Sequence, residues 1–242
     1  RMLQRIQVSF ERERRFRADA AHELFTPLSG LQNEIDVALR HRREPTYYER
    51  SLLAARGHAE RMGATLDSLL QLSGAESMEG RTRQKVDVSK FVERRLKHFA
   101  SRIAASDIDL VHDLHRNTIV SVDPSHLEVI IDNIIDNAIK YTPARGTIRI
   151  SVSQTVDGVV LTVTDTGVGF TQPEQPLLFD RFFRSDDPSI QRTNGSGLGL
   201  SIANALVDMY GGQLRASSPG RGMGSTFEAR FSLTPPYPAH ND

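Results

Sequence analysis

Apolar residues recur at steps of three and four over the first part of the chain. One stripe consists of Leu24, Leu28, Leu31, Ile35 and Leu39. A second stripe, with heptad spacing, consists of Leu52, Ala55, Ala59, Met62, Leu66 and Leu69. Such periods are typical of apolar helix faces. Residues 41–46 break the pattern and include Pro45, which favours a helix start, so the sequence predicts an antiparallel helical hairpin.

A hairpin of two helices cannot enclose a hydrophobic core by itself. Two hairpins together form a four-helix bundle with a shared core. We therefore expect a homodimer through this region. In the alternative, the hairpin packs on the remainder of its own chain.

Beyond residue 85 the pattern indicates an α/β domain. Short β-branched runs predict strands over 86–88, 108–111, 118–122, 147–155, 159–164, 214–216 and 225–232. Helical periodicity predicts helices over 91–104, from 124 onward and over 198–210. Asp123 and Pro124 supply an N-cap and a favourable first helical residue, and Asp157-Gly158 indicates a hairpin turn. The sequence therefore predicts a mixed sheet covered by helices on one face.

A polar, glycine-containing segment without periodicity separates the two regions at residues 73–85. This composition is typical of a linker. The fold class is thus α + α/β. We expect a helical hairpin at 1–73, a linker at 74–85, an α/β domain at 86–236 and a tail at 237–242.

The composition excludes several classes of protein. Lys plus Arg and Asp plus Glu both number 30, so the net charge is zero, and a nucleic-acid binder would carry a basic excess. The absence of cysteine excludes disulfides, cysteine zinc sites and thiol nucleophiles. An apolar fraction of 38% argues against disorder. No apolar run is long enough to span a membrane, and the charged first twenty residues do not form a signal peptide.

A pair of asparagines marks the helix that starts at Pro124. Asn133 and Asn137 are four residues apart, so their amides share one helix face. A carboxamide oxygen suits magnesium, and Lys140 could meet a phosphate as a point charge. An ordinary solvated helix face would give the same pattern.

Two glycine motifs follow. Asp165, Gly167 and Gly169 stand directly after a predicted strand, where a carboxylate can accept a hydrogen bond from an exocyclic amine such as that of adenine. Glycines there permit close backbone approach to a ligand, although ordinary turns use the same residues. The second motif, Gly195 to Leu200, opens a helix, whose N–H groups bind anions. It lacks the lysine-serine pair of a P-loop.

The segment between the motifs, residues 170–194, contains Phe179-Asp-Arg181-Phe-Phe-Arg184. A loop of this length in a compact domain is functional or disordered. Its arginines and aromatic residues suit a lid that aims cations at a triphosphate. The alternative is a floppy surface insert.

The order of these four motifs resembles the ATP-binding domain shared by sensor histidine kinases, DNA gyrase, MutL-type repair proteins and heat-shock chaperone ATPases, where they are called the N, G1, F and G2 boxes. The resemblance covers residues 86–233 and implies the α/β sandwich of that family. Phe179–Arg184 resembles the histidine-kinase version, and Gly224-Ser-Thr-Phe227 resembles the strand start near the end of these domains.

The resemblance implies ATP and Mg²⁺ as cofactors and assigns residues to them. Asn137 becomes a magnesium ligand, Asn133 and Lys140 phosphate-side contacts, and Asp165 the adenine contact. The other residues assigned to the nucleotide site are Tyr141, Gly167, Gly169, Arg181, Arg184, Gly195, Gly197, Leu198 and Gly199.

One histidine of the hairpin has the placement of a reactive group. His22 lies nearly opposite the first apolar stripe, so its imidazole is expected to be exposed, and an imidazole that titrates near neutrality is a usable nucleophile. Glu23 could hold one ring N–H, and Pro27 permits a bend. An ordinary surface histidine is the alternative.

The string from His22 to Leu28 resembles the H box of sensor histidine kinases of the commonest dimerisation subfamily. The resemblance implies that His22 is phosphorylated by ATP, that Glu23 assists, and that Thr26 helps position water for regulator dephosphorylation. The phosphoryl group would pass to an aspartate in the receiver domain of a response regulator. The family usually has arginine where this chain has Phe25. This departure is expected to affect domain or regulator contacts rather than to abolish phosphorylation.

Two rival functions are a clamp-type ATPase of the same nucleotide fold and a non-catalytic regulatory scaffold. The clamp predicts a large transducer domain after the ATP site, and the scaffold predicts loss of Asn137 or Asp165. We expect the chain to be the cytoplasmic portion of a bacterial inner-membrane protein, connected to the membrane only through an N-terminal sensor region, with residues 1–15 ending a connecting helix.

Overall fold

The computed structural model describes residues 2–76, 83–193 and 195–232, so the predicted tail lies outside the described residues. The chain divides into two compact units. The first comprises Arg1–Ser73 with Asn194–Leu198, and the second comprises Gly74–Thr193 with Gly199–Asp242.

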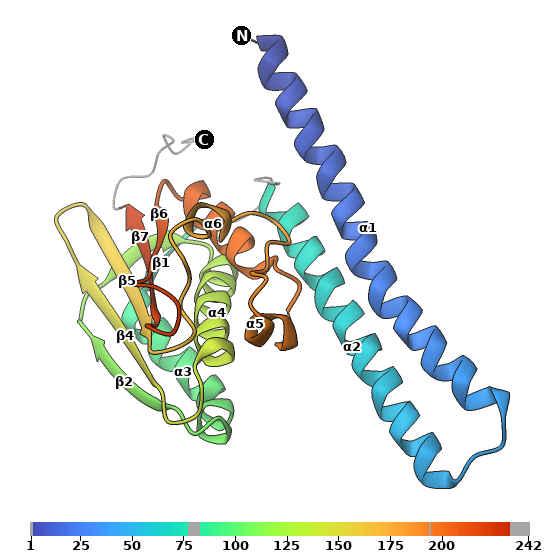
Figure 1. The fold of residues 1–242 in the computed structure, drawn as a ribbon. Helices are drawn as coiled ribbons and strands as arrows, with labels where there is room; N and C mark the ends of the chain where they lie inside the picture. The colour runs from blue at the N-terminus through green and yellow to red at the C-terminus, as the bar shows by residue number, and fades with distance from the viewer. Residues whose placement is uncertain (1, 77–82, 194, 233–242) are drawn as a thin grey trace. The chain divides into compact units, whose positions relative to one another are not determined.

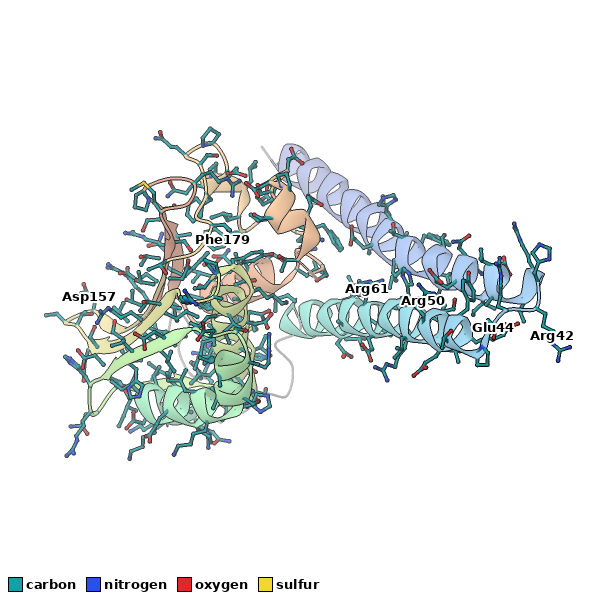
Figure 2. The ribbon with its side chains drawn as sticks, turned by 60° about the horizontal axis from the view of Figure 1, so that its bottom comes forward. Arg42, Glu44, Arg50, Arg61, Asp157 and Phe179 are labelled. Carbon is teal, nitrogen blue, oxygen red and sulfur yellow. The ribbon has the colours of Figure 1, made fainter. Side chains whose placement is uncertain are left out.

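The first unit contains the predicted hairpin, formed by helices α1 (Met2–Arg40) and α2 (Pro45–Glu76) (Figure 1). Arg42 and Glu44 lie in the turn that joins them (Figure 2). The helices approach closely where the imidazole of His58 fills the space beside Gly30, because a Cβ at Gly30 would overlap the ring. The hairpin prediction is confirmed.

The second apolar stripe of the hairpin divides into two faces. Ala55 is buried and Met62 and Leu69 are half-buried, and these three residues keep heptad spacing. Leu52 and Leu66, at the alternate heptad positions, are 69% and 50% exposed. The hairpin therefore leaves a second apolar row of α2 uncovered in a single chain.

The second unit is built on a five-stranded mixed sheet of order β2-β4-β5-β7-β6, in which β2 and β4 are parallel and the other pairs antiparallel. Its strands are β2 (Asp109–Leu114), β4 (Thr147–Gln154), β5 (Gly158–Asp165), β6 (Gln213–Ser217) and β7 (Ser225–Ser232). The strands β1 (Gln84–Asp87) and β3 (Ile119–Val122) form a separate antiparallel pair. The mixed sheet was predicted, whereas this separate pair was not.

Three amphipathic helices lie together on one side of the sheet (Figure 1). They are α3 (Val88–Ala105), α4 (Pro124–Tyr141) and α6 (Gly199–Met209). Helix α4 starts as predicted, because the Asp123 carboxylate accepts the Ser125 N–H at 2.8 Å and Pro124 is the first helical residue. Its apolar face, which includes Ile130 and Ile134, is fully buried. This central helix carries both asparagines of the predicted nucleotide site.

The elements extend into the predicted linker from both sides. Helix α2 continues to Glu76 and β1 starts at Gln84. A single glycine costs a helix only about 1 kcal/mol, so Gly74 does not end α2. Val88, predicted as strand, begins α3 instead, because Asp87 caps that helix by accepting the Lys90 N–H.

Candidate functional site

His22 lies exposed on α1 in the first unit. The Thr26 hydroxyl donates to the His22 carbonyl oxygen at 3.0 Å, one helical turn away. Pro27 is buried and remains inside a continuous helix, so the predicted bend does not interrupt α1. Glu23 is half-buried, and the Phe25 side chain is 63% exposed. An accessible imidazole is therefore present, next to an apolar ring that solvent also reaches.

Asn133 and Gly199 come together in the second unit. The Asn133 amide nitrogen donates to the Val129 carbonyl oxygen at 2.8 Å, which fixes the orientation of the carboxamide. A Cβ at Gly199 would overlap the Asn133 Oδ1 atom. The start of α6 thus lies directly against the asparagine face of α4, so that a side chain at position 199 would displace the Asn133 carboxamide.

Lys140 forms an ion pair on its own helix. Its Nζ atom lies 2.5 Å from Asp136 Oδ2, and Arg102 of α3 donates to the other Asp136 oxygen at 2.6 Å. A lysine has three N–H donors, so this pairing leaves capacity for a phosphate. Asn137, which follows Asp136 in α4, is half-buried.

Asp165 ends β5 and is only 4% exposed. Its Oδ1 atom accepts the Gly167 N–H at 2.7 Å, and its Oδ2 atom accepts the Ser225 hydroxyl at 2.5 Å. Burial raises the pKa of Asp165, while the bonds from Ser225 and Gly167 work against that rise. Each carboxylate oxygen has two lone pairs, so this anchored carboxyl group can accept a further donor from a ligand.

The glycines after Asp165 permit close approach of backbone to backbone. A Cβ at Gly167 would overlap the Tyr141 carbonyl oxygen, and the Val168 N–H donates to the same oxygen at 3.1 Å. Gly169 has a φ of +56°, where an L side chain is strained, and a Cβ there would overlap the Gly220 carbonyl oxygen. Gly167 and Val168 thus hold the loop after β5 against the end of α4, and Gly169 lies against the backbone at Gly220.

Arg184 is bound to backbone oxygens. Its Nη2 atom donates to the carbonyl oxygens of Ile190 and Thr193, each at 2.6 Å. These atoms lie at the end of α5 (Pro188–Arg192), whose last carbonyls need donors. Burial, with the Asp136 charge, raises the pKa of Tyr141 above its ordinary value, and the Arg184 charge opposes this rise. Arg184 therefore also acts electrostatically on Tyr141. Arg181 is exposed.

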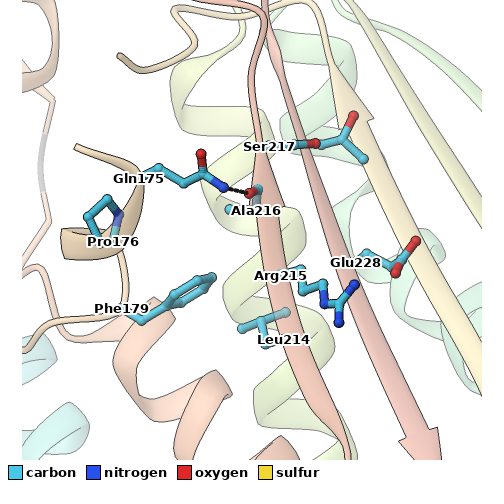
Figure 3. Close-up of a pocket in the computed structure, with 9 residues that line it drawn as sticks. Gln175, Pro176, Phe179, Leu214, Arg215, Ala216, Ser217 and Glu228 are labelled. Carbon is cyan, nitrogen blue, oxygen red and sulfur yellow. Dashed lines mark hydrogen bonds between the residues drawn. The ribbon is translucent and has the colours of Figure 1, made fainter. Parts of the chain in front are cut away.

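The segment that contains Phe179 packs beside edge strand β6. Gln175, in the 3-10 helix η1 (Gln175–Leu177), donates from its side-chain amide to the Ala216 carbonyl oxygen at 2.9 Å (Figure 3). A pocket of about 580 Å³ opens there. It is lined by Gln175, Pro176, Phe179, Leu214, Arg215, Ala216, Ser217, Thr226 and Glu228. This part of the segment is held by specific contacts and is not a floppy insert.

A turn that the sequence analysis did not assign to the site, Ser218–Gly224, holds the loop after β5. The Gly224 N–H donates to the Gly167 carbonyl oxygen at 3.0 Å, and the Gly222 N–H donates to the Val168 carbonyl oxygen at 2.8 Å. Gly220, Gly222 and Gly224 all have positive φ. Their alternate spacing was the available cue, because three such glycines indicate an unusual backbone path.

The predicted G2 motif divides between the two units. Gly195, Gly197 and Leu198 group with the first unit, whereas Gly199 groups with the second. Asn133, Tyr141, Asp165, Gly167, Gly169 and Gly199 thus lie within one unit, and Gly195, Gly197 and Leu198 are not placed against them. Their role in nucleotide binding stays a prediction.

Two protein families match consecutive parts of the chain. Residues 12–77 match the family described as "His Kinase A (phospho-acceptor) domain". Residues 122–235 match "Histidine kinase-, DNA gyrase B-, and HSP90-like ATPase". The two matches define a phosphoacceptor domain followed by an ATPase-type domain, an order that favours a kinase over a clamp-type ATPase.

Individual relatives are also histidine kinases. The sensor protein kinase PmrB of Pseudomonas aeruginosa is 32% identical over 97% of this chain and 49% of its own length. The solved structure of the mycobacterial sensor histidine kinase MprB is 31% identical, with a TM-score of 0.55, over 63% of this chain and 99% of that one. The histidine kinase ThkA, solved in complex with the response regulator protein TrrA, has the same fold, with a TM-score of 0.74 over 97% of this chain and 68% of that one at 20% identity. The chain belongs to the two-component sensor histidine kinases, and it spans about half the length of PmrB.

Within the described part of the chain, no helix combines the length and apolar character needed to cross a bilayer. Among the same residues, no group of three or more His, Asp or Glu side chains gathers as a metal site would require.

Proposed function

We propose that this chain phosphorylates itself on His22 with ATP and passes the phosphoryl group to an aspartate of a response regulator. The observation that carries the proposal is the exposed His22 within a phosphoacceptor domain, in the same chain as an ATPase-type domain with a buried Asp165. Glu23 would hold one ring N–H of His22, so that the other nitrogen attacks.

The phosphoryl transfer needs no covalent chemistry beyond the attacking imidazole. A ring nitrogen of His22 forms a bond to the γ-phosphorus, the bond to the β-phosphate bridging oxygen breaks, and ADP leaves. Asp165 would accept a hydrogen bond from the exocyclic amine of adenine, while Asn133 and Lys140 would contact the phosphates. Catalysis in such transfers is mainly positioning and electrostatic stabilisation.

Asn137 would hold the magnesium ion. Its carboxamide is half-buried on the asparagine face of α4, and a carboxamide oxygen is a hard ligand of the kind Mg²⁺ accepts. Mg²⁺ in phosphoryl-transfer sites takes most ligands from phosphates and water, which fits a site with one protein ligand. The bound ion would neutralise phosphate charge.

The contact between Asn133 and Gly199 gives a first prediction. Gly199→Ala should force the Asn133 carboxamide to move and should weaken ATP binding about five- to tenfold, as loss of one phosphate hydrogen bond does. Folding stability should change by less than about 1 kcal/mol, because alanine is the better helix former. Calorimetric titration with ATP and thermal unfolding measure the two effects.

Gly63→Ala is the matched control, because this glycine is also helical and a Cβ there would meet no atom within 4 Å beyond its chain neighbours and the backbone of its own helix. ATP affinity in that variant should equal the wild-type value. Unchanged ATP affinity in Gly199→Ala would contradict the role proposed for Asn133.

The regulator would dock on the hairpin near His22. ThkA, which shares the fold, was solved with a response regulator. Thr26, one turn from His22, would position water for regulator dephosphorylation, and the exposed ring of Phe25 would contribute to the surface presented to the partner. From the names and lengths of its relatives we also propose that the chain is the cytoplasmic catalytic portion of a longer membrane sensor.

Dimerisation would cover the uncovered apolar face of the hairpin. Leu39 of α1 and Leu52 of α2 are 77% and 69% exposed, and a second hairpin supplies the matching surface in a four-helix bundle. Leu39→Glu with Leu52→Glu should convert the dimer to monomers in sedimentation experiments. Burial of each leucine contributes about 1.5–3 kcal/mol, so the dissociation constant should rise by at least about 100-fold.

Val156→Glu is the control for this change, because Val156 is 97% exposed at the turn between β4 and β5. It should leave the dimer intact. A wild-type chain that sediments as a monomer would instead support packing of the hairpin on its own chain.

Incubation with labelled ATP and Mg²⁺ tests the proposed function. The kinase should retain label on the protein, in a form that acid removes and alkali does not, as expected for phosphohistidine. ATP hydrolysis without label on the protein would indicate the clamp-type ATPase. Absence of ATP binding would indicate the non-catalytic scaffold.

A further inference from the structure

One arginine connects three segments of the ATPase-type unit. Arg221, in the turn Ser218–Gly224, donates from Nη1 to the Gly169 carbonyl oxygen at 2.9 Å. Its Nη2 atom donates to Glu174 and to the Ser185 hydroxyl. Its Nε atom lies 3.9 Å from Asp187 Oδ2. A single guanidinium thus meets both ends of the segment that carries Phe179–Arg184.

Glu174 links Arg221 to Thr171, at the start of the same segment. Its second oxygen, Oε2, accepts both the backbone N–H and the hydroxyl of Thr171, at 2.8 and 2.6 Å. Burial disfavours the charged carboxylate, but bonds from Ser185 and Thr171 and the Arg221 charge lower its pKa overall. The side chains of Arg221 and Glu174 are only 28% and 18% exposed, so water screens this pair less than a surface pair.

Arg221 also extends an existing pattern in the backbone. The carbonyl oxygens of Gly167 and Val168 already accept N–H groups of Gly224 and Gly222. The guanidinium supplies the donor for the next carbonyl in the row, that of Gly169. The turn Ser218–Gly224 therefore binds three consecutive carbonyls of the loop after Asp165, and the Arg221 side chain of that turn also binds Glu174.

We infer that Arg221 is a positioning residue for the nucleotide site, which fixes the base of the Phe170–Asp187 segment against the loop after Asp165. The inference rests on the proposed function, because it assigns the segment a role in holding ATP. Arg221 acts through Gly169, Glu174 and Ser185 and not on the reacting atoms.

The expected consequence is a selective loss of ATP affinity. Without Arg221 the segment would occupy its binding-competent arrangement for a smaller fraction of time, and apparent affinity falls in proportion to that fraction. Arg221→Met should raise the KM for ATP about tenfold, the equivalent of one charged hydrogen bond. The autophosphorylation rate at saturating ATP should stay within about twofold, because the reacting atoms are unaffected.

The experiment uses a double-mutant cycle in the full chain. Arg221→Met, Glu174→Gln and the double variant are compared for KM, maximal rate and ATP dissociation constant. The double variant should be no worse than Arg221→Met alone, since both changes break one connection. Arg221→Lys should recover only part of the affinity, because lysine lacks the fork that reaches several acceptors.

Arg230→Met is the matched control, because Arg230 also pairs with a glutamate, Glu228, at 2.6 Å, and this pair lies within strand β7. It should leave the KM unchanged. Additive effects in the cycle, or a lowered melting temperature with an unchanged KM, would overturn the inference by showing a purely structural role.

Hydrogen exchange separates this inference from the proposed function. Without nucleotide, Arg221→Met and Glu174→Gln should both accelerate amide exchange over residues 170–187 and leave β4 and β5 protected. Unchanged exchange would overturn the inference. A wild-type chain that binds ATP but labels no histidine would contradict the proposed function alone, and the exchange and ATP dissociation constants would still test Arg221.

Discussion

His22→Gln should abolish the acid-labile label completely while leaving ATP affinity within about twofold of wild type. Glutamine keeps a polar side chain of similar length on the exposed face of α1, but an amide nitrogen has no lone pair available for attack on phosphorus. The loss therefore reflects removal of the nucleophile, and effects of such groups on rate reach many powers of ten. Filter binding of labelled protein and calorimetric titration with ATP give the two readouts.

His41→Gln serves as the control for this result, because His41 is also exposed and lies just after the end of α1. It should be labelled like wild type. Label that persists in His22→Gln and disappears in His41→Gln would show that the acceptor has been assigned to the wrong histidine.

Asp165→Asn should weaken ATP binding about 30-fold or more, the cost of removing one charged hydrogen bond and leaving a donor unpaired. The wild-type carboxylate accepts from Gly167 and Ser225 and would keep a lone pair for the adenine amine. Asparagine has a single acceptor oxygen, and its NH₂ group would face one of these donors. Ser225→Ala, which removes only a supporting bond, should have a smaller effect.

The burial of Asp165 adds a dependence on pH to the same experiment. Burial raises its pKa, so protonation should begin at a higher pH than for an ordinary aspartate. Protonation removes the negative charge and turns one oxygen into a donor, which weakens the hydrogen bond from the adenine amine, so ATP affinity should fall as the pH falls through that raised value. The free energy of unfolding has the opposite dependence on pH. A raised folded-state pKa means that folding favours the neutral carboxyl group. The resulting stabilisation is fully present below the unfolded-state pKa and is lost as the pH rises through the folded-state pKa. Asp165→Asn should remove both dependences, and an ATP affinity that follows the same pH profile in wild type and variant would contradict the adenine contact.

Local pattern predicted the long helices and the strands of this chain, because period and capping are encoded within a few residues, but it did not predict the short helices η1 and α5 inside the segment interpreted as a loop. Asp123 and Pro124 fixed the start of α4, and alternation fixed β4, β5 and β7 within about a residue or two of their observed ends. The exposure of His22 followed from its angle on the helix relative to the leucine stripe.

Contacts between distant segments could not be predicted in this way. Arg221 lies 52 residues from Gly169 in the chain, and nothing in its neighbours indicates that partner. Local pairs were overlooked as well: the sequence analysis did not identify the ion pair of Lys140 with Asp136, four residues away on the same helix. Arg184 binds carbonyl oxygens at the end of α5, a short helix that the sequence pattern did not indicate, and its role at a triphosphate stays a prediction.

The row of three carbonyls bound by the turn Ser218–Gly224 restricts changes of loop length in this unit. Adding or deleting one residue in that turn would shift all three donors out of register at once, so a reporter peptide inserted there would disturb the loop after Asp165. The tip of the β4–β5 hairpin, where Asp157 projects (Figure 2), carries no such register and offers a place for a fluorescent or affinity tag.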